Sequence, residues 1–139
     1  MLTVKLKKNE DRRLRAGHLW IYSNEIDTEA TPIKAVAAGT LCRFSDTRGK
    51  ILGVGYINPT ALLCGRLLTG KADATIDTNW FQRRLVSALD LRKRLYPTPH
   101  YRLVFGDSDG LPGLVVDRYD DVLVVQMTTA GMEQLKPLV

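Results

Sequence analysis

The stretch Arg102-Leu-Val-Phe-Gly106-Asp-Ser-Asp-Gly110-Leu-Pro-Gly113-Leu-Val-Val-Asp-Arg118-Tyr-Asp-Asp-Val-Leu-Val-Val-Gln126 organises the second half of the chain. Its three glycines and one proline separate short apolar runs. Glycine permits positive φ and proline fixes φ, so the middle of the stretch predicts a tight, shaped loop. The runs 114–116 and 122–125 flank the polar segment 117–121, which predicts a β-hairpin with a turn of about four or five residues.

Asp107, Ser108 and Asp109 lie inside this loop and raise two catalytic or binding alternatives. A calcium loop would need an oxygen ligand where Leu111 stands and a closing Glu where Arg118 stands, so the calcium alternative fails. A serine hydrolase would need a base, and neither histidine of the chain has a suitable context. We therefore expect the two acids and the serine to brace the turn through hydrogen bonds to the backbone.

Three segments carry a family resemblance. Gly106-Asp-Ser-Asp-Gly-Leu-Pro-Gly-Leu-Val-Val-Asp-Arg-Tyr119 resembles the hallmark of S-adenosylmethionine-dependent ribosomal RNA methyltransferases that convert a cytosine of the large-subunit RNA to 5-methylcytosine. Arg15-Ala-Gly-His-Leu-Trp-Ile-Tyr-Ser-Asn-Glu-Ile26 is similar to the N-terminal signature of that family, with Leu19 where the family often has proline. Gly53-Val-Gly-Tyr-Ile-Asn-Pro59, leading to Arg66, matches as well, so the resemblance extends over essentially the whole chain.

The resemblance implies an N-terminal PUA domain, a central α/β domain and a C-terminal methyltransferase domain with the cofactor and a catalytic cysteine. We therefore expect an α+β fold, with a PUA-like β pseudo-barrel over residues 1–70 and an incomplete central α/β domain over 71–139. Neither Cys42 nor Cys64 matches the catalytic position of the family. The resemblance thus predicts a fragment that has no catalytic residue, is inactive alone and lacks the domain that binds S-adenosylmethionine; a stand-alone RNA-binding or adaptor protein is the alternative.

The distribution of charge supports an RNA partner. Residues 1–70 contain eleven Lys or Arg and six Asp or Glu, whereas residues 71–139 contain nine of each. The basic excess of the first half favours a surface that faces a polyanion, and the resemblance makes that polyanion ribosomal RNA. No apolar run approaches the roughly 20 residues of a membrane span. Lysines and arginines interrupt the N-terminal segment, so we expect no secretory signal and a cytoplasmic protein.

The candidate RNA-binding residues surround a short helix near the N-terminus. Asn9 is the expected helix cap and Gly17 the expected stop, which places Arg12 and Arg15 three residues apart on one face. His18 is expected to form hydrogen bonds rather than act as an acid or base. Trp20 lies in an apolar run and is expected in the core, although it could stack on a base. The complete candidate set is Lys8, Arg12, Arg15, His18 and Arg66.

Strand and helix patterns complete the two halves. The runs 41–44, 51–57 and 62–68 predict strands of the barrel, which bury Cys42 and Cys64 as free thiols. Asp77 is the expected cap of a helix that continues to Tyr96. Its predicted apolar face holds Phe81, Leu85, Ala88 and Leu95, and Arg92 within that face must pair or extend to solvent.

The strand over residues 122–125 is apolar at every position, a pattern that predicts burial of both of its faces. We expect this strand to recruit a second copy of the chain, or the C-terminal part to be loosely ordered.

Overall fold

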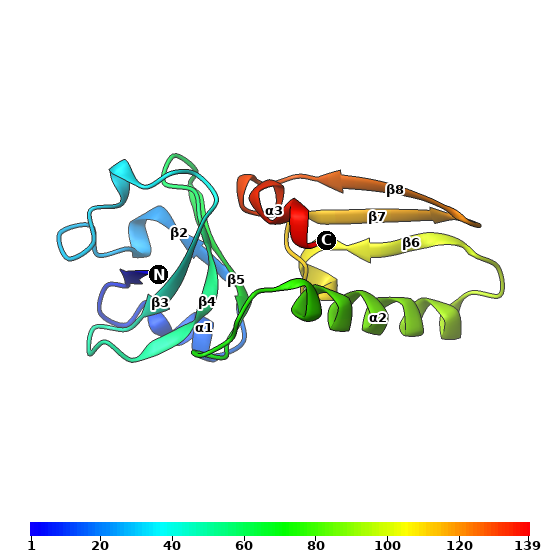
Figure 1. The fold of residues 1–139 in the computed structure, drawn as a ribbon. Helices are drawn as coiled ribbons and strands as arrows, with labels where there is room; N and C mark the ends of the chain where they lie inside the picture. Colours follow the sequence, from blue (N-terminus) through cyan, green and yellow to red (C-terminus); the bar gives the residue numbers. More distant parts are fainter. The chain divides into compact units, whose positions relative to one another are not determined.

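The computed structural model describes all residues from 1 to 139, and the chain divides into two compact units, Met1–Ala74 and Thr75–Val139. Each unit combines a β-sheet with short helices, which confirms the predicted α+β fold class (Figure 1). The strands are β1 (Leu2–Lys5), β2 (Trp20–Tyr22), β3 (Thr40–Ser45), β4 (Ile51–Ile57), β5 (Leu63–Thr69), β6 (His100–Phe105), β7 (Leu114–Tyr119) and β8 (Val122–Met127). The helices are α1 (Asp11–Arg15), α2 (Thr78–Leu95) and α3 (Ala130–Leu135), with short 3-10 turns at Ser23–Glu25, Ile33–Ala35, Gly106–Asp109 and Lys136–Leu138.

The first unit is a five-stranded sheet with the order β1-β3-β4-β5-β2. β1 pairs with β3 in parallel, and the other pairs are antiparallel. The segments that follow β1 and β2 then pair with each other through the bridge Leu6–Ile26. Two backbone hydrogen bonds of 2.9 Å, from Lys7 to Glu25 and from Asp27 to Lys5, flank this bridge. The two ends of the sheet are thereby joined, which makes a small pseudo-barrel.

The core of the first unit lies inside this closed sheet and depends on close backbone approach at one glycine. A Cβ at Gly65 would lie 2.9 Å from the ring of Phe44 and 3.1 Å from Ile21, so only glycine fits between these buried side chains. Cys42 and Cys64 belong to the same core and are free thiols, as predicted. The other buried apolar residues of this cluster are Val4, Leu6, Leu14, Ile26, Ile33, Ile57 and Leu67.

The expected cap of α1 and the expected position of Trp20 are both wrong. Asn9 does not cap α1: its φ is +72°, and Glu10 occupies the cap position without a side-chain hydrogen bond. The side chain of Asn9 accepts a hydrogen bond from Arg12 instead. Trp20 is not in the core, because its neighbour Ile21 takes the inward position of β2 and leaves Trp20 40% exposed. Gly17, with φ +97°, follows the last turn of the helix, as expected of a stop signal.

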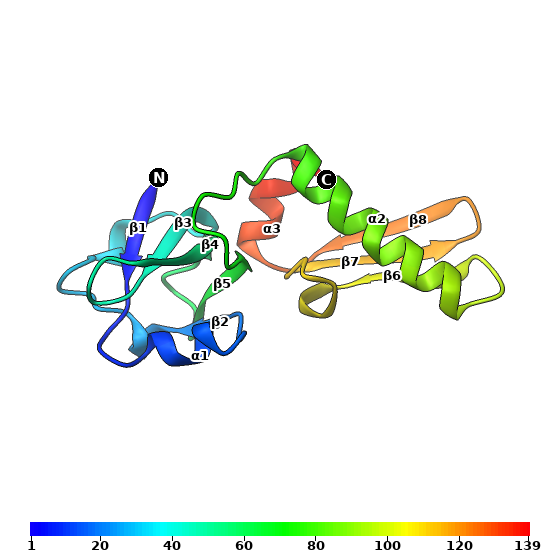
Figure 2. The same ribbon diagram turned by 90° about the horizontal axis from the view of Figure 1, so that it is seen from below.

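The second unit is a three-stranded antiparallel sheet with the order β6-β7-β8, and α2 runs along one side of it, in contact with β6 (Figure 2). The Asp77 side chain accepts a hydrogen bond from the Trp80 backbone at 2.7 Å and caps α2 as predicted. The buried face of α2 consists of Trp80, Phe81 and Ala88. Leu95 is 61% exposed, so its predicted place on this face is wrong. In the last turn Arg92, which donates to the Arg102 carbonyl of β6 at 3.1 Å, lies on the side of the sheet, and Leu95 faces solvent.

In the glycine-rich loop between β6 and β7, the three glycines and Asp109 behave as predicted, whereas Ser108 is exposed. Gly106, Gly110 and Gly113 all have positive φ. Asp109 accepts a hydrogen bond from the Phe105 backbone at 2.7 Å and two from the guanidinium of Arg92 at 2.5 and 2.8 Å. Asp109 therefore braces the turn. It is also the partner of Arg92, so of the two predicted alternatives Arg92 pairs and does not extend to solvent.

The hairpin between β7 and β8 is present, but its turn is shorter than predicted. Tyr119 pairs directly with Val122, so the turn contains only two residues. The first three residues assigned to the turn, 117 to 119, belong to β7 because β6 pairs with them. Arg102 binds Asp117 at 2.9 Å, and Arg118 donates to the Tyr101 hydroxyl at 2.8 Å. No helix of the chain is long and apolar enough to cross a lipid bilayer.

Candidate nucleic-acid interface

Four of the five predicted residues come from one continuous segment that contains the turn after β1, the helix α1 and the loop before β2. Lys8, Arg12 and His18 are exposed along this segment. Arg66 is distant in sequence, but the antiparallel pairing of β2 with β5 places it opposite Trp20. The fold therefore gathers the predicted residues around α1 and β2, although it does not direct all of them toward one point.

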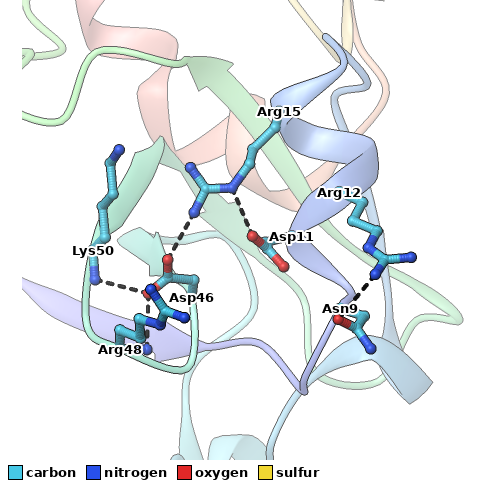
Figure 3. Close-up of polar contacts among 7 residues, drawn as sticks. All are labelled: Asn9, Asp11, Arg12, Arg15, Asp46, Arg48 and Lys50. Carbon is cyan, nitrogen blue, oxygen red and sulfur yellow. Dashed lines mark hydrogen bonds and ion pairs between the residues drawn. The ribbon is translucent and has the colours of Figure 1, made fainter.

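Arg15 is held by two carboxylates (Figure 3). Its guanidinium lies 2.6 Å from Asp11 and 2.7 Å from Asp46, and its side chain is 40% exposed. The hydrogen bond from Arg15 holds the pKa of the Asp11 carboxyl below its ordinary value. Two nearby negative charges offset the charge of Arg15, so this residue attaches α1 to the β3–β4 turn and is less available to phosphate.

Asp46 is the centre of this arrangement. One carboxylate oxygen accepts hydrogen bonds of 2.9 Å from the backbones of Arg48 and Lys50, and the other accepts from Arg15. Gly49 completes the turn with φ +83°. A side chain that is 10% exposed thus fixes the shape of a turn that carries two exposed cations, Arg48 and Lys50.

Arg12 extends away from Arg15. Figure 3 shows their side chains on different sides of α1, and the Arg12 guanidinium bonds Asn9 at 3.4 Å. The expectation that Arg12 and Arg15 share one face toward a ligand is therefore wrong in this structure. The physical reason is the attraction of Arg15 to Asp46, a residue 31 positions away that the helical spacing could not reveal.

Arg13 lies between these two arginines and also supports the fold. It pairs with the buried carboxylate of Glu25 at 2.9 Å, and its guanidinium lies 5.4 Å from the ring centroid of Tyr22. The other oxygen of Glu25 accepts a hydrogen bond from the Tyr22 backbone at 2.7 Å. These contacts fasten α1 to the end of β2, so Arg13 positions the helix that carries Arg12.

Trp20 joins the candidate surface although the sequence placed it in the core. Its side chain is 40% exposed, and the Arg66 guanidinium lies 5.8 Å from its ring centroid. The pattern Trp20-Ile21-Tyr22 is consistent with a strand whose alternate residues face outward, and that alternation is the signal that could have found it. Only the pairing of β2 with β5 brings Arg66 to the ring.

The surface therefore combines exposed cations with one exposed aromatic ring. Cations attract phosphates, and an aromatic ring offers a face to a nucleobase. The structure contains no group of three or more His, Cys, Asp or Glu side chains that could hold a metal ion. An arrangement of exposed cations beside an aromatic ring is suited to bind a nucleic acid.

Comparison with known proteins shows what the two units are similar to. Residues 4–70 match the model of a family described as a PUA-like domain. The chain is 38% identical to ribosomal RNA large subunit methyltransferase I of Alteromonas mediterranea and 39% identical to that of Tolumonas auensis, in each case over 135 residues, 94% of this chain and 33% of the relative. The chain thus spans about a third of the length of the curated relatives it matches.

The fold has a counterpart among solved structures. "A putative sam-dependent methyltransferase from Streptococcus mutans" superposes with a TM-score of 0.82 at 17% sequence identity, over 99% of this chain and 36% of that one. Identity at this level supports the fold alone. The sequence matches go further: this chain contains a PUA-like domain and is homologous to ribosomal RNA large subunit methyltransferases I over about a third of their length.

Proposed function

We propose that this chain is the RNA-binding region of an S-adenosylmethionine-dependent ribosomal RNA methyltransferase and holds RNA for a catalytic domain outside residues 1–139. The observation that carries this proposal is the similarity of 94% of the chain to one third of ribosomal RNA large subunit methyltransferases I. The PUA-like domain and the basic excess of residues 1–70 support the same role. Such an enzyme would act in the cytoplasm.

The proposal extends to the reaction. The product would be 5-methylcytosine in large-subunit RNA, formed after a cysteine of the catalytic domain attacks the pyrimidine ring, with the methyl group supplied by S-adenosylmethionine. The two cysteines of this chain do not suit that role. Burial raises the pKa of Cys42 to about 12 and that of Cys64 to about 11, so both thiols are protonated and weakly nucleophilic at neutral pH.

The residues proposed to contact RNA are Lys8, Arg12, His18 and Arg66, with Arg15 also within the surface. Binding of ribosomal RNA fragments across a series of salt concentrations tests this set. Arg12→Ala should weaken binding to all RNA sequences and reduce the salt slope by about one, as for the loss of one phosphate contact. Lys93→Ala removes an exposed cation of the second unit and is the matched control. Equal effects of both variants would contradict the assignment.

A stand-alone RNA-binding or adaptor protein is the second candidate, because it requires only the surface described above. Both candidates predict salt-dependent RNA binding, but only the first requires a methyltransferase domain in the same polypeptide. Reading the open reading frame past Val139 separates them. Calorimetry with S-adenosylmethionine should give no binding heat for residues 1–139, and measurable heat would contradict the proposed division of labour.

A further inference from the structure

Trp20 has an unusual position for a tryptophan in an apolar run. β2 is the last strand in the sheet order β1-β3-β4-β5-β2, so Trp20 lies on a strand with one unpaired edge. Ile21 points into the core with no exposed surface, and the alternation of a strand turns Trp20 to the opposite side. The result is a large ring that is 40% exposed within a basic unit.

Arg66 lies beside this ring. The two residues are direct partners in the pairing of β2 with β5, and the guanidinium carbon lies 5.8 Å from the ring centroid. Arg66 is half-buried and its backbone lies within a paired strand, so the arginine is anchored at its base. An indole that already packs beside a guanidinium offers a partly ordered aromatic face to a ligand, which favours binding.

The neighbouring pair, Tyr22 and Arg13, shows what a purely supporting contact looks like in the same strand. Arg13 lies 5.4 Å from the Tyr22 ring centroid, but it is also bound to buried Glu25, and Tyr22 is only partly accessible. Trp20 is the more exposed of the two rings. Of the two pairs, the Trp20 pair is therefore the one that offers an accessible aromatic surface.

We propose that Trp20 and Arg66 form a stacking platform for one unpaired nucleobase of the RNA. Every nucleobase has a π-face, so an exposed indole accepts an unpaired base of any sequence, and the adjacent guanidinium can contact its phosphate. A base inside a duplex is already stacked on its neighbours and is not available. This inference rests on the proposed RNA-binding function and adds to it the class of ligand, a single-stranded or bulged nucleotide.

The test uses the full 139-residue chain with a single-stranded oligoribonucleotide and with a blunt-ended duplex, joined without a loop, of the same composition. Trp20→Ala should weaken single-strand binding about 10-fold, as for the loss of one stacked base, and change duplex binding less than about 2-fold. Trp20→Phe retains an aromatic face and should preserve most of the affinity. Arg66→Ala should weaken the binding of both RNAs and lower the dependence of affinity on salt concentration.

A fluorine NMR measurement on the unaltered chain tests the platform without any variant, so a folding defect cannot affect the result. The chain has two tryptophans, Trp20 and buried Trp80, so fluorotryptophan labelling gives two fluorine NMR signals. The Trp20 signal should shift with the single strand and stay in place with the duplex, while the Trp80 signal should move with neither. If single strand and duplex bind but affect the Trp20 signal equally or not at all, the platform is wrong and the RNA-binding function stands. If neither RNA binds, both proposals are wrong.

Discussion

At the scale of single residues, Asp46 shows how one buried carboxylate shapes a basic surface. It accepts hydrogen bonds from two backbone amides of the β3–β4 turn and from Arg15. Asp46→Ala leaves two amides without this acceptor, so we expect a loss of about 1–3 kcal/mol in the free energy of unfolding. Urea denaturation measures it. Thr47→Ala, at the exposed neighbouring position, should change stability by less than about 0.5 kcal/mol; a similar effect of both variants would contradict the role of Asp46.

The buried thiols give a prediction about pH. Burial and the neighbouring Cys64 raise the pKa of Cys42 to about 12, and burial raises the pKa of Cys64 to about 11. The pKa of a cysteine in the unfolded chain is about 8.5. A raised pKa means that folding favours the protonated thiol. This contribution to stability is complete below about pH 8.5 and is lost as the pH rises toward the folded-state values.

Chemical denaturation of the unaltered chain between about pH 8 and 11 should therefore show falling stability. The double variant Cys42→Ala/Cys64→Ala should show a smaller fall, because it lacks both titrating groups. Alkylation by iodoacetamide at pH 8 should be slow in buffer and fast in urea. Equal pH dependence of the two proteins, or rapid alkylation of the folded chain, would show that the thiols are not protected.

At the scale of elements, the ion pair between α2 and the glycine-rich loop connects parts of the second unit. Arg92 and Asp109 have side chains that are 12% and 7% exposed, so removal of one partner leaves a poorly solvated charge. Asp109→Ala should lower the free energy of unfolding of the second unit by about 3 kcal/mol, measured by thermal or urea denaturation. Ser108→Ala alters the exposed neighbour and should be almost neutral, within about 0.5 kcal/mol. A neutral Asp109→Ala would contradict the bracing role.

The strand β8 supports a prediction about self-association. Val122, Leu123, Val124 and Val125 are between 44% and 56% exposed, although they alternate between the two faces, and β8 is the edge of its sheet. A second copy of the chain is a suitable cover, because β8 contains no charged residue and its acidic turn lies at one end only. Antiparallel pairing of two β8 strands keeps these acidic turns apart and provides hydrogen-bond partners for the unpaired backbone groups of the edge strand.

Light scattering after size exclusion should therefore show a dimer that Val124→Lys converts to a monomer, because a lysine on an edge strand opposes pairing. Val86→Lys is the matched control, since Val86 is 48% exposed on α2, outside the strand. A parent chain that remains monomeric at high concentration would refute the pairing. Loss of the dimer in both variants would place the contact elsewhere.

At the scale of the whole molecule, the local signals predicted the elements well. Asp77 began α2, the strands β3 to β5 fell within a residue of their expected ranges, and the positive φ angles of Gly106, Gly110 and Gly113 matched the loop. These features depend on neighbours in sequence. The hairpin turn was predicted too long because its polar residues find partners in β6, which lies on a different part of the chain.

Composition, periodicity and motifs are local properties, and they were enough to predict the α+β class, the basic first half and the segments that resemble a methyltransferase family. Which arginines remain available to a ligand, and which ring is exposed, depends on contacts that form when the chain folds. Asp46 engages Arg15 across 31 residues, and the pairing of β2 with β5 brings Arg66 to Trp20. Charges and rings acquire their roles from partners that are distant in sequence, and folding is what brings those partners within a few ångströms.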